Sequence, residues 1–418
     1  MSIQKIAIET NRIRVVNILT SSLTVRFLEG QPEYFETKGF EVVVVSSPGE
    51  ELSQAHERGV QTIAIPMARE ISPWSDLRSL WKIWRVLSRL RPAITNVATP
   101  KAGLLGSIAA WVCRIPCRYY TLLGLRCETT TGLKRQLLLF TERIACLGAH
   151  RVICVSESLR QKAIDLGIVD ARRTVVLASG GYTGVDPKRF APSPELLRRA
   201  GQIRRDLGIP PQAPVAGFVG RLTRDKGIAE LVEAYLELRT RIPELRLLLV
   251  GDSEEGDPLP PNTRLRIENE PGIIRVGFVQ DPVPYYHVMD VLAFPTHREG
   301  FGNVALEAQA SGKPVVAARA TGVVDSVIDG VTGILVPIGD PKALAEALQL
   351  VLKDPRLAAA LGAAGRERVL REFQQQRIWD AIVQEYLQQL RDKGLPLPNS
   401  AAGKVVTSAV TAGPLVSR

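Results

Sequence analysis

The chain has 418 residues, of which 45% are hydrophobic and 23% charged, a composition that fits a globular protein of two ordinary domains. No apolar run is long enough to span a bilayer, and the opening residues, MSIQKIAIETNR, lack the basic-then-apolar pattern of a signal peptide. The net charge of +10 comes from the first half, because residues 1–200 hold 28 Lys and Arg against 17 Asp and Glu.

This basic half favours an anionic membrane face or a phosphate-bearing molecule as partner. No nucleic-acid-binding motif accompanies it, so we expect no nucleic acid partner. The cysteines, Cys113, Cys117, Cys127, Cys146 and Cys154, are odd in number and have no histidine at zinc spacing. We therefore expect reduced, mostly buried thiols in a cytoplasmic protein; a redox pair at Cys113 and Cys117 is the less favoured alternative.

Residues 1–12 are expected to be a loose lead-in, followed by alternating apolar strands and helical segments, which indicates parallel βαβ units. Strands of the first half are expected at 14–19, 40–45, 62–65, 94–97, 118–122, 151–155 and 174–177. Helical segments are expected at 24–38, 54–58, 76–91, 103–110, 133–147 and after the capping residue Ser156.

The helix expected at 76–91 is strongly amphipathic, with Leu77, Trp81 and Trp84 among its apolar positions and a basic opposite side. The favoured interpretation is a helix packed on the sheet with a solvated basic face. A second interpretation, which does not exclude the first, is that the tryptophans touch an anionic membrane surface.

Residues 192–214 are rich in proline and contain a charged helix, which is typical of an inter-domain connector. A second series follows, with strands expected at 215–219, 245–250, 273–276, 291–294, 315–317 and 333–336. Its helices are expected at 228–240, near Tyr285, from Asn303, from Asp340 and at 373–390, and residues 253–263 are expected to be a loop.

Two basic residues, Arg221 and Lys226, flank the loop after the strand at 215–219. An arginine fork and a lysine charge that converge on one point suit a diphosphate, although a solvated basic turn would have the same sequence. There is no Walker loop, and no GxGxxG sequence follows the first strand. A P-loop nucleotidase and a Rossmann-type dehydrogenase are therefore disfavoured.

The stretch 296–316, THREGFGNVALEAQASGKPVV, contains a turn from Glu299 to Gly302 and then a helix that opens at Asn303, a good capping residue. A helix start suits a phosphate because its backbone N–H groups are free and its dipole is positive there. Glu299 lies on the loop and Glu307 just over one turn inside the helix. The plain alternative is an ordinary strand-to-helix turn with surface carboxylates.

The expected fold class is α/β, with two doubly wound, Rossmann-like domains that face each other across a cleft. We expect a lead-in at 1–12, an N-terminal domain at 13–195, a linker at 196–213 and a C-terminal domain at 214–372. A helix at 373–392 should pack back toward the N-terminal domain, and 393–418 should be a disordered tail. Loops that follow the strands should lie at the cleft.

The segments FVGRLTRDKG, GFVQDPVPYYHVMDVLAFPT and REGFGNVALEAQASGKPVVA resemble the C-terminal domain of the retaining glycosyltransferases of family four, which have the GT-B fold. In the first half, TPKAGLLG, YTLLGLRCETTTG and VICVSESLR resemble a bacterial branch that adds sugars to lipid-linked oligosaccharides for capsule or O-antigen. The likeness covers most of residues 14–392.

The resemblance implies that Arg221 and Lys226 hold the diphosphate of a nucleotide sugar and, with Glu299, form the catalytic set. Glu299 would also contact the donor hexose, and Glu307 the ribose hydroxyls. Further implied donor contacts are main chain at Gly277, Phe278 and Val279 for the base, and Gly300, Phe301, Gly302, Asn303 and Val304 for sugar and phosphate. The acceptor-side candidates are Ser21, Ser22, Thr99, Lys101, Arg126 and Glu128. The family needs no metal and no cofactor, since the nucleotide sugar is a substrate.

Two positions depart from the family pattern. Many relatives have a histidine near the reacting sugar where this chain has Leu123, so that contact is lost or made by another group such as Arg126. Relatives often have a glutamate in the loop after Gly322, where this chain has the shorter Asp325. The second change could alter the sugar preference.

The expected function is transfer of a hexose or N-acetylhexosamine from a nucleotide sugar to a polyprenyl-diphosphate-linked saccharide, with UDP as the favoured nucleotide. The enzyme would act in bacterial surface polysaccharide synthesis, peripherally attached to the inner face of the cytoplasmic membrane. A GT-B sugar-nucleotide epimerase and a non-catalytic nucleotide-sugar-binding partner remain open as alternatives.

Overall fold

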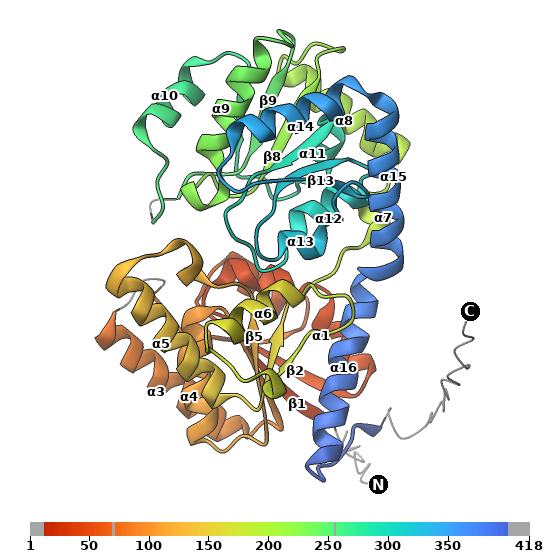
Figure 1. The fold of residues 1–418 in the computed structure, drawn as a ribbon. Helices are drawn as coiled ribbons and strands as arrows, with labels where there is room; N and C mark the ends of the chain where they lie inside the picture. The colour runs from red at the N-terminus through yellow and green to blue at the C-terminus, as the bar shows by residue number, and fades with distance from the viewer. Residues whose placement is uncertain (1–11, 69–71, 255, 400–418) are drawn as a thin grey trace, which may run out of the picture.

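The computed structural model describes residues 12–68, 72–254 and 256–399. The lead-in expected over 1–12, apart from Arg12, and the expected tail from residue 400 onward lie outside the described residues. The described chain forms two α/β domains, one above the other in Figure 1, with a long helical segment running down the side of both. The predicted fold class, two doubly wound α/β domains, is confirmed.

The N-terminal domain is built on a parallel sheet whose strands are continuous apolar runs, as expected of a sheet covered on both faces. In strand β2, FEVVVVS, every residue except Glu41 is buried. The strands are β1 (Ile13–Ile18), β2 (Phe40–Ser46), β3 (Gln61–Ala64), β4 (Ile94–Ala98), β5 (Cys117–Leu122), β6 (Arg151–Cys154) and β7 (Thr174–Val175), in the order β3-β2-β1-β4-β5-β6-β7. The helices are α1 (Gln31–Thr37), α2 (Glu50–Glu57), α3 (Pro73–Leu90), α4 (Pro100–Val112), α5 (Gly132–Gly148) and α6 (Glu157–Asp165).

The C-terminal domain repeats this design. Its strands are β8 (Val215–Val219), β9 (Arg246–Val250), β10 (Ile273–Gly277), β11 (Val291–Phe294), β12 (Val315–Ala318) and β13 (Gly333–Val336), in the order β10-β9-β8-β11-β12-β13. The remaining helices are α7 (Pro187–Phe190), α8 (Pro194–Asp206), α9 (Ile228–Arg239), α10 (Pro261–Asn269), α11 (Val283–Val288), α12 (Asn303–Ala310), α13 (Val323–Ser326), α14 (Pro341–Lys353), α15 (Pro355–Glu372) and α16 (Gln375–Asp392).

The strand order reverses between β1 and β4 in one sheet and between β8 and β11 in the other. In doubly wound sheets the ligand crevice opens at such a reversal, outside the carboxyl ends of the strands. The loops that follow these four strands are therefore the natural place for a site.

Two predicted elements were wrong, and one long helix was missed. The segment 24–38 is not one helix but a 3₁₀ helix, Ser22–Leu28, followed by α1, because Gly30 has a left-handed φ of 77°. Helix α10 begins inside the segment expected to be a loop. Helix α15 was not expected at all; its Gly362 lets it pack on the turn after α12, where an added Cβ would lie 2.2 Å from the carbonyl oxygen of Gly312.

The proline-rich connector is also more structured than expected, because α8 packs on α11 of the C-terminal domain. In the N-terminal domain, all five cysteines are free thiols and only Cys113 is not fully buried, as the sequence predicts.

Helix α16 lies against the N-terminal domain, as Figure 1 shows. The ring of Tyr386 is buried there among Phe35, Phe40 and Tyr119, with centroid separations of 6.1, 6.1 and 4.9 Å. Beyond the helix, Lys393 Nζ donates a hydrogen bond to a carbonyl of the N-terminal domain. The chain is thus placed past residue 393, where the sequence predicts the start of a disordered tail.

Candidate active site

A cavity of about 980 Å³ lies between the two domains. Its walls come from the loops that follow β1, β8 and β11, which are strands at the two strand-order reversals, and from residues 182–190. The predicted donor-site residues that line it are Arg221, Lys226, Glu299, Gly300, Phe301, Gly302, Asn303, Val304 and Glu307. The fold therefore brings the basic loop after β8 together with the two glutamates after β11.

The basic loop and the glutamates are joined by an ion pair. Lys226 Nζ donates to Glu299 Oε1, and the exposed fractions of these side chains are only 14% and 18%. Arg221 is more exposed and pairs with Glu254. Arg298 pairs with Asp225 at 2.6 Å and ties the end of β11 to the same loop. Arg221 and Lys226, which line the cleft, thus each pair with a carboxylate.

Glu307 lies on α12 and is partly buried at the base of the cleft, where Tyr286 Oη donates a hydrogen bond to its Oε2 at 2.6 Å. Burial raises the pKa of Glu307, and the hydrogen bond from Tyr286 partly opposes that shift. A carboxylate held in this way can accept hydrogen bonds from vicinal hydroxyls of a ligand.

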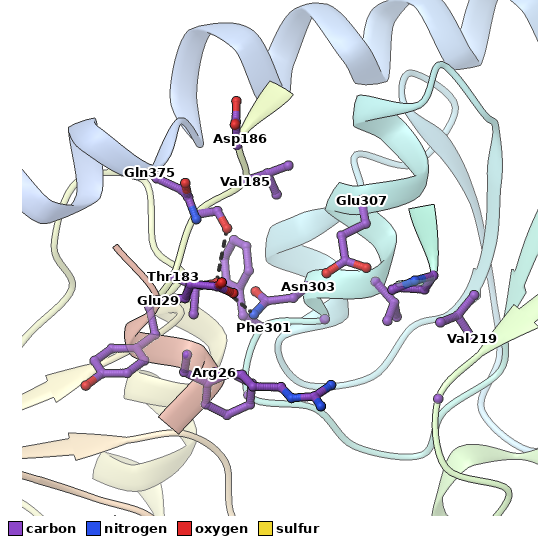
Figure 2. Close-up of a pocket in the computed structure, with 18 of the residues that line it drawn as sticks. Arg26, Glu29, Thr183, Val185, Asp186, Val219, Phe301, Asn303, Glu307 and Gln375 are labelled. Atoms are coloured by element: carbon purple, nitrogen blue, oxygen red, sulfur yellow. Dashed lines mark hydrogen bonds between the residues drawn. The ribbon is translucent and has the colours of Figure 1, made fainter. Parts of the chain in front are cut away.

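The start of α12 differs from the sequence prediction. Gly302, with a left-handed φ of 85°, occupies the N-cap position, and Asn303 is already helical. Asn303 Nδ2 instead donates to Thr183 Oγ1 at 3.2 Å, a contact drawn in Figure 2 beside Glu307. No side chain caps this helix and its first turn has no acidic residue. Its N-terminal end therefore remains suitable for an anionic group.

At Gly300 the backbones of the two domains are in close contact. A Cβ added there would lie 2.1 Å from the carbonyl oxygen of Leu123, so a larger residue would force the domains apart. Ser156 Oγ donates to the carbonyl oxygen of Gly300 at 2.7 Å. Leu123, which replaces the histidine of many relatives, lines the cleft, whereas Arg126, the suggested substitute, does not.

The base-binding prediction is not supported by the cavity, since Gly277, Phe278 and Val279 do not line it; the next residue, Gln280, does. The Phe278 ring instead faces Arg26 of the N-terminal domain, whose guanidinium carbon lies 5.3 Å from the ring centroid. Arg26 extends into the cleft below Asn303 in Figure 2. The sequence analysis missed Arg26 because it placed this residue inside a continuous helix.

The acceptor-side candidates do not line the cleft, and most have partners inside the protein. Ser22 is buried and donates to Glu51 at 2.5 Å. Thr99 shares a 2.6 Å hydrogen bond with Thr20, and Lys101 pairs with Asp76 at 2.7 Å. Outside the cleft as well are Ser21, Arg126 and Glu128.

Glu128 and Asp325 form contacts between the domains. Glu128 Oε2 accepts from Thr321 Oγ1 at 2.6 Å. Asp325, the position that departs from the family pattern, accepts from Ser158 Oγ and from the backbone N–H of Glu157 at 3.0 Å, at the start of α6. The shorter carboxylate of Asp325 is therefore engaged with the opposite domain.

The described residues contain no group of three or more His, Cys, Asp or Glu side chains arranged to hold a metal ion. In the same part of the chain, every helix is too short or too polar to cross a membrane.

Two facing Rossmann-like domains, with cations and carboxylates gathered in the cleft between them, are the architecture of the GT-B class. Comparison with known proteins supports this assignment. A family model described as "Glycosyl transferases group 1" matches residues 213–354, and one described as "Glycosyl transferase 4-like domain" matches residues 27–180.

The capsular polysaccharide biosynthesis glycosyltransferase CapM of Staphylococcus aureus is 36% identical over 374 residues, 89% of this chain and 96% of that protein. Two solved structures share the fold. Anabaena Alr3699/HepE in complex with UDP-glucose has a TM-score of 0.75 at 21% identity, covering 90% of this chain and 99% of its own. Sucrose-phosphate synthase of Thermosynechococcus elongatus has a TM-score of 0.75 at 24% identity, covering 91% and 100%. The chain therefore belongs to the family-four glycosyltransferases.

Proposed function

We propose that this glycosyltransferase moves a hexose or N-acetylhexosamine from a UDP-sugar to a polyprenyl-diphosphate-linked saccharide during surface polysaccharide synthesis, with retention of configuration. The observation that carries the proposal is the convergence of Arg221, Lys226, Glu299 and Glu307 on one cavity. Two supporting facts come from other proteins: CapM is named for capsular polysaccharide biosynthesis, and HepE was solved with UDP-glucose.

In this proposal the charges of the cleft do most of the catalytic work. Arg221 and Lys226 bind the diphosphate and stabilise the negative charge that develops on it as the bond to the sugar breaks. Lys226 is already in place, because its Nζ is held by Glu299 in a mostly buried position. Glu299, released from Lys226 by the diphosphate, accepts hydrogen bonds from the donor sugar. Glu307 binds the ribose hydroxyls.

These side chains supply the positive charge that a divalent cation would otherwise bring, and we propose that transfer needs no metal. Activity measured after removal of divalent cations with a chelator should stay near its untreated value. Loss of activity on chelation, restored by Mg²⁺ or Mn²⁺, would contradict this part of the proposal.

The peripheral attachment to an anionic membrane is proposed from the outer surface of the N-terminal domain. On α3, Trp74 and Trp81 have exposed fractions of 80% and 51%, and basic residues alternate with them. On α5, Leu133 and Phe140 are exposed as well. Exposed tryptophans with flanking cations are suited to a headgroup region.

The test of the function is a mass-spectrometric screen of nucleotide sugars against polyprenyl-diphosphate sugars, run with and without acceptor. We expect one UDP-sugar to extend the acceptor by a single residue. Turnover of donor to an isomer without acceptor would identify an epimerase, and absence of any turnover would identify a non-catalytic binding protein. Sedimentation with vesicles of phosphatidylglycerol at moderate salt tests the membrane attachment, which absence of binding would exclude.

A further inference from the structure

A second cavity, of about 410 Å³, lies at the domain interface outside the donor cleft. It is lined by the loop after β5, by α5 and α6 of the N-terminal domain, and by the ends of β11 and β12 in the C-terminal domain. In Figure 1, α6 lies at the interface directly below α13, and α5 approaches it from the side. The cavity therefore exists only when the two domains are together.

The cavity is lined by Arg135 on α5, Lys162 on α6, and Arg319 after β12. Among the described residues, the side chains of Arg135 and Lys162 make no hydrogen bond or ion pair, whereas Arg319 pairs with Asp329. His297 also lines the cavity, and its hydrogen bond with Glu230 raises its pKa. Cations from both domains thus face one space, and two of them make no direct hydrogen bond or ion pair, although the charge of Lys162 also acts on Glu128. Such a group of cations suits a polyanion such as a diphosphate.

Glu128 supplies the opposite chemistry in the same cavity. Its Oε2 accepts from Thr321, but its Oε1 is buried and has no hydrogen-bond partner. A buried carboxylate oxygen without a partner is costly, and a hydroxyl-bearing ligand would satisfy it. Cations beside a hydroxyl acceptor are the two features needed to bind a sugar attached to a diphosphate.

The second cavity is linked to the donor cleft through Thr321. Thr321, which holds Glu128, also accepts through its carbonyl oxygen a hydrogen bond from the backbone N–H of Glu299 at 3.2 Å. Thr321 therefore contacts both Glu128 and Glu299, so a sugar bound at Glu128 would lie one residue away from Glu299.

The apolar side of α5 gives a second, independent observation. Leu133, Leu137, Phe140 and Leu147 have exposed fractions of 89%, 43%, 59% and 68%, and their spacing places them on one outward face of the helix. Arg135, in the first turn of that helix, lines the cavity, and helical spacing places it on the side of α5 away from this apolar face. A lipid tail on the apolar face and its diphosphate in the cavity would therefore lie on the two sides of one helix.

We propose that this second cavity is the acceptor subsite: Arg135, Lys162 and Arg319 bind the diphosphate of the lipid-linked saccharide, and Glu128 binds a hydroxyl of its sugar. The inference rests on the proposed function for the nature of the acceptor. It adds a place for that acceptor and residues that the family motifs do not contain.

The kinetic test uses a short-chain prenyl-diphosphate sugar without vesicles, so that membrane binding does not contribute. Arg135→Ala and Lys162→Ala should each raise the acceptor KM roughly tenfold, with kcat and donor KM nearly unchanged. Lys134→Ala is the matched control, since Lys134 is the neighbouring cation on α5 but does not line the cavity. Equal acceptor KM values in all three variants and the unmodified protein would overturn the inference while leaving the proposed function intact.

A binding measurement keeps the site testable if transfer itself is not observed. Farnesyl diphosphate is titrated calorimetrically into protein saturated with UDP, which occupies the donor cleft. We expect binding to the unmodified protein and to Lys134→Ala, and binding at least roughly tenfold weaker to the Arg135→Ala/Lys162→Ala double variant. Identical binding to all three, or no binding to any, would remove the subsite; transfer failing while this pattern holds would contradict only the proposed function. If phosphatidylglycerol micelles bound to the three proteins with the same pattern as farnesyl diphosphate, the site would recognise a lipid headgroup in general, which also overturns the inference.

Discussion

The sheets of the two domains have corresponding strand orders, but the loops that follow their strands are used differently. In the C-terminal domain, the loops after β8 and β11 direct Arg221, Lys226 and Glu299 into the cleft. In the N-terminal domain, the polar residues after β1 and β4 are bound inside the domain: Thr20 and Thr99 share a hydrogen bond, and Lys101 pairs with Asp76 of α3. The C-terminal domain, which we propose to bind the donor, therefore directs the polar residues of its motifs into the cleft, whereas the N-terminal domain uses its polar loop residues to hold its own loops.

The largest expected effect falls on the donor half. Arg221→Ala or Lys226→Ala should lower kcat by roughly two or more orders of magnitude, because charge on the leaving diphosphate loses its stabilisation. Steady-state kinetics with the identified donor measures this change. Lys101→Ala, which removes a mostly buried cation after β4 of the other half, should reduce the rate far less. Near-normal turnover of both Arg221→Ala and Lys226→Ala would contradict the proposal that these two cations stabilise the leaving diphosphate.

A smaller effect is expected at the base of the same cleft. Glu307→Gln should raise the donor KM roughly tenfold, because a neutral amide accepts hydrogen bonds from ribose hydroxyls less strongly than a carboxylate. Tyr286→Phe removes the hydrogen bond to Glu307 but keeps the carboxylate, so it should change the donor KM only severalfold. If the two variants had equal effects, the role of Glu307 would be structural.

The contact between the halves can be tested through Asp325. Asp325→Ala removes the acceptor of Ser158 and of the backbone of α6, so the domains should open, with a larger radius of gyration in solution scattering and a severalfold lower rate. Ser158→Ala removes the same contact from the other side. Their effects should therefore be non-additive, with a coupling of roughly 0.5–3 kcal/mol; fully additive effects would mean that each residue acts separately.

The smallest expected effect is on stability in the N-terminal half. Glu142 is fully buried beside Tyr120, and burial raises its pKa from 4.5 to about 7, against the opposing hydrogen bond from Tyr120. The unfolded chain loses this proton first, so the free energy of unfolding should fall as pH rises from 4.5 to 7 and then level off. The change should be on the order of 1–3 kcal/mol. Denaturant titrations at several pH values should show a smaller change in the free energy of unfolding in Glu142→Gln. An unchanged pH dependence in that variant would mean that other groups cause it.

The sequence was sufficient for the strands and for predicting that most of the proposed donor-site residues line one cavity, because buried parallel strands are continuous apolar runs and the loops after them have fixed spacing. It was not sufficient where tertiary contacts decide. Gly30 interrupts a segment that has helical propensity throughout, and this break places Arg26 at the cleft. Likewise, no local pattern shows that Lys101 faces Asp76 or that Phe278 faces Arg26, since those contacts join distant parts of the chain.

Helix α16 means that the order of the chain and the order of the domains do not coincide. The last helix completes the first domain, since Tyr386 fills a space between Phe35, Phe40 and Tyr119 that would otherwise be open to water. A hybrid enzyme that borrows acceptor preference from a relative must therefore exchange two separate stretches of gene, one from each end. A single crossover between the domains would join a sheet to a helix shaped for another protein.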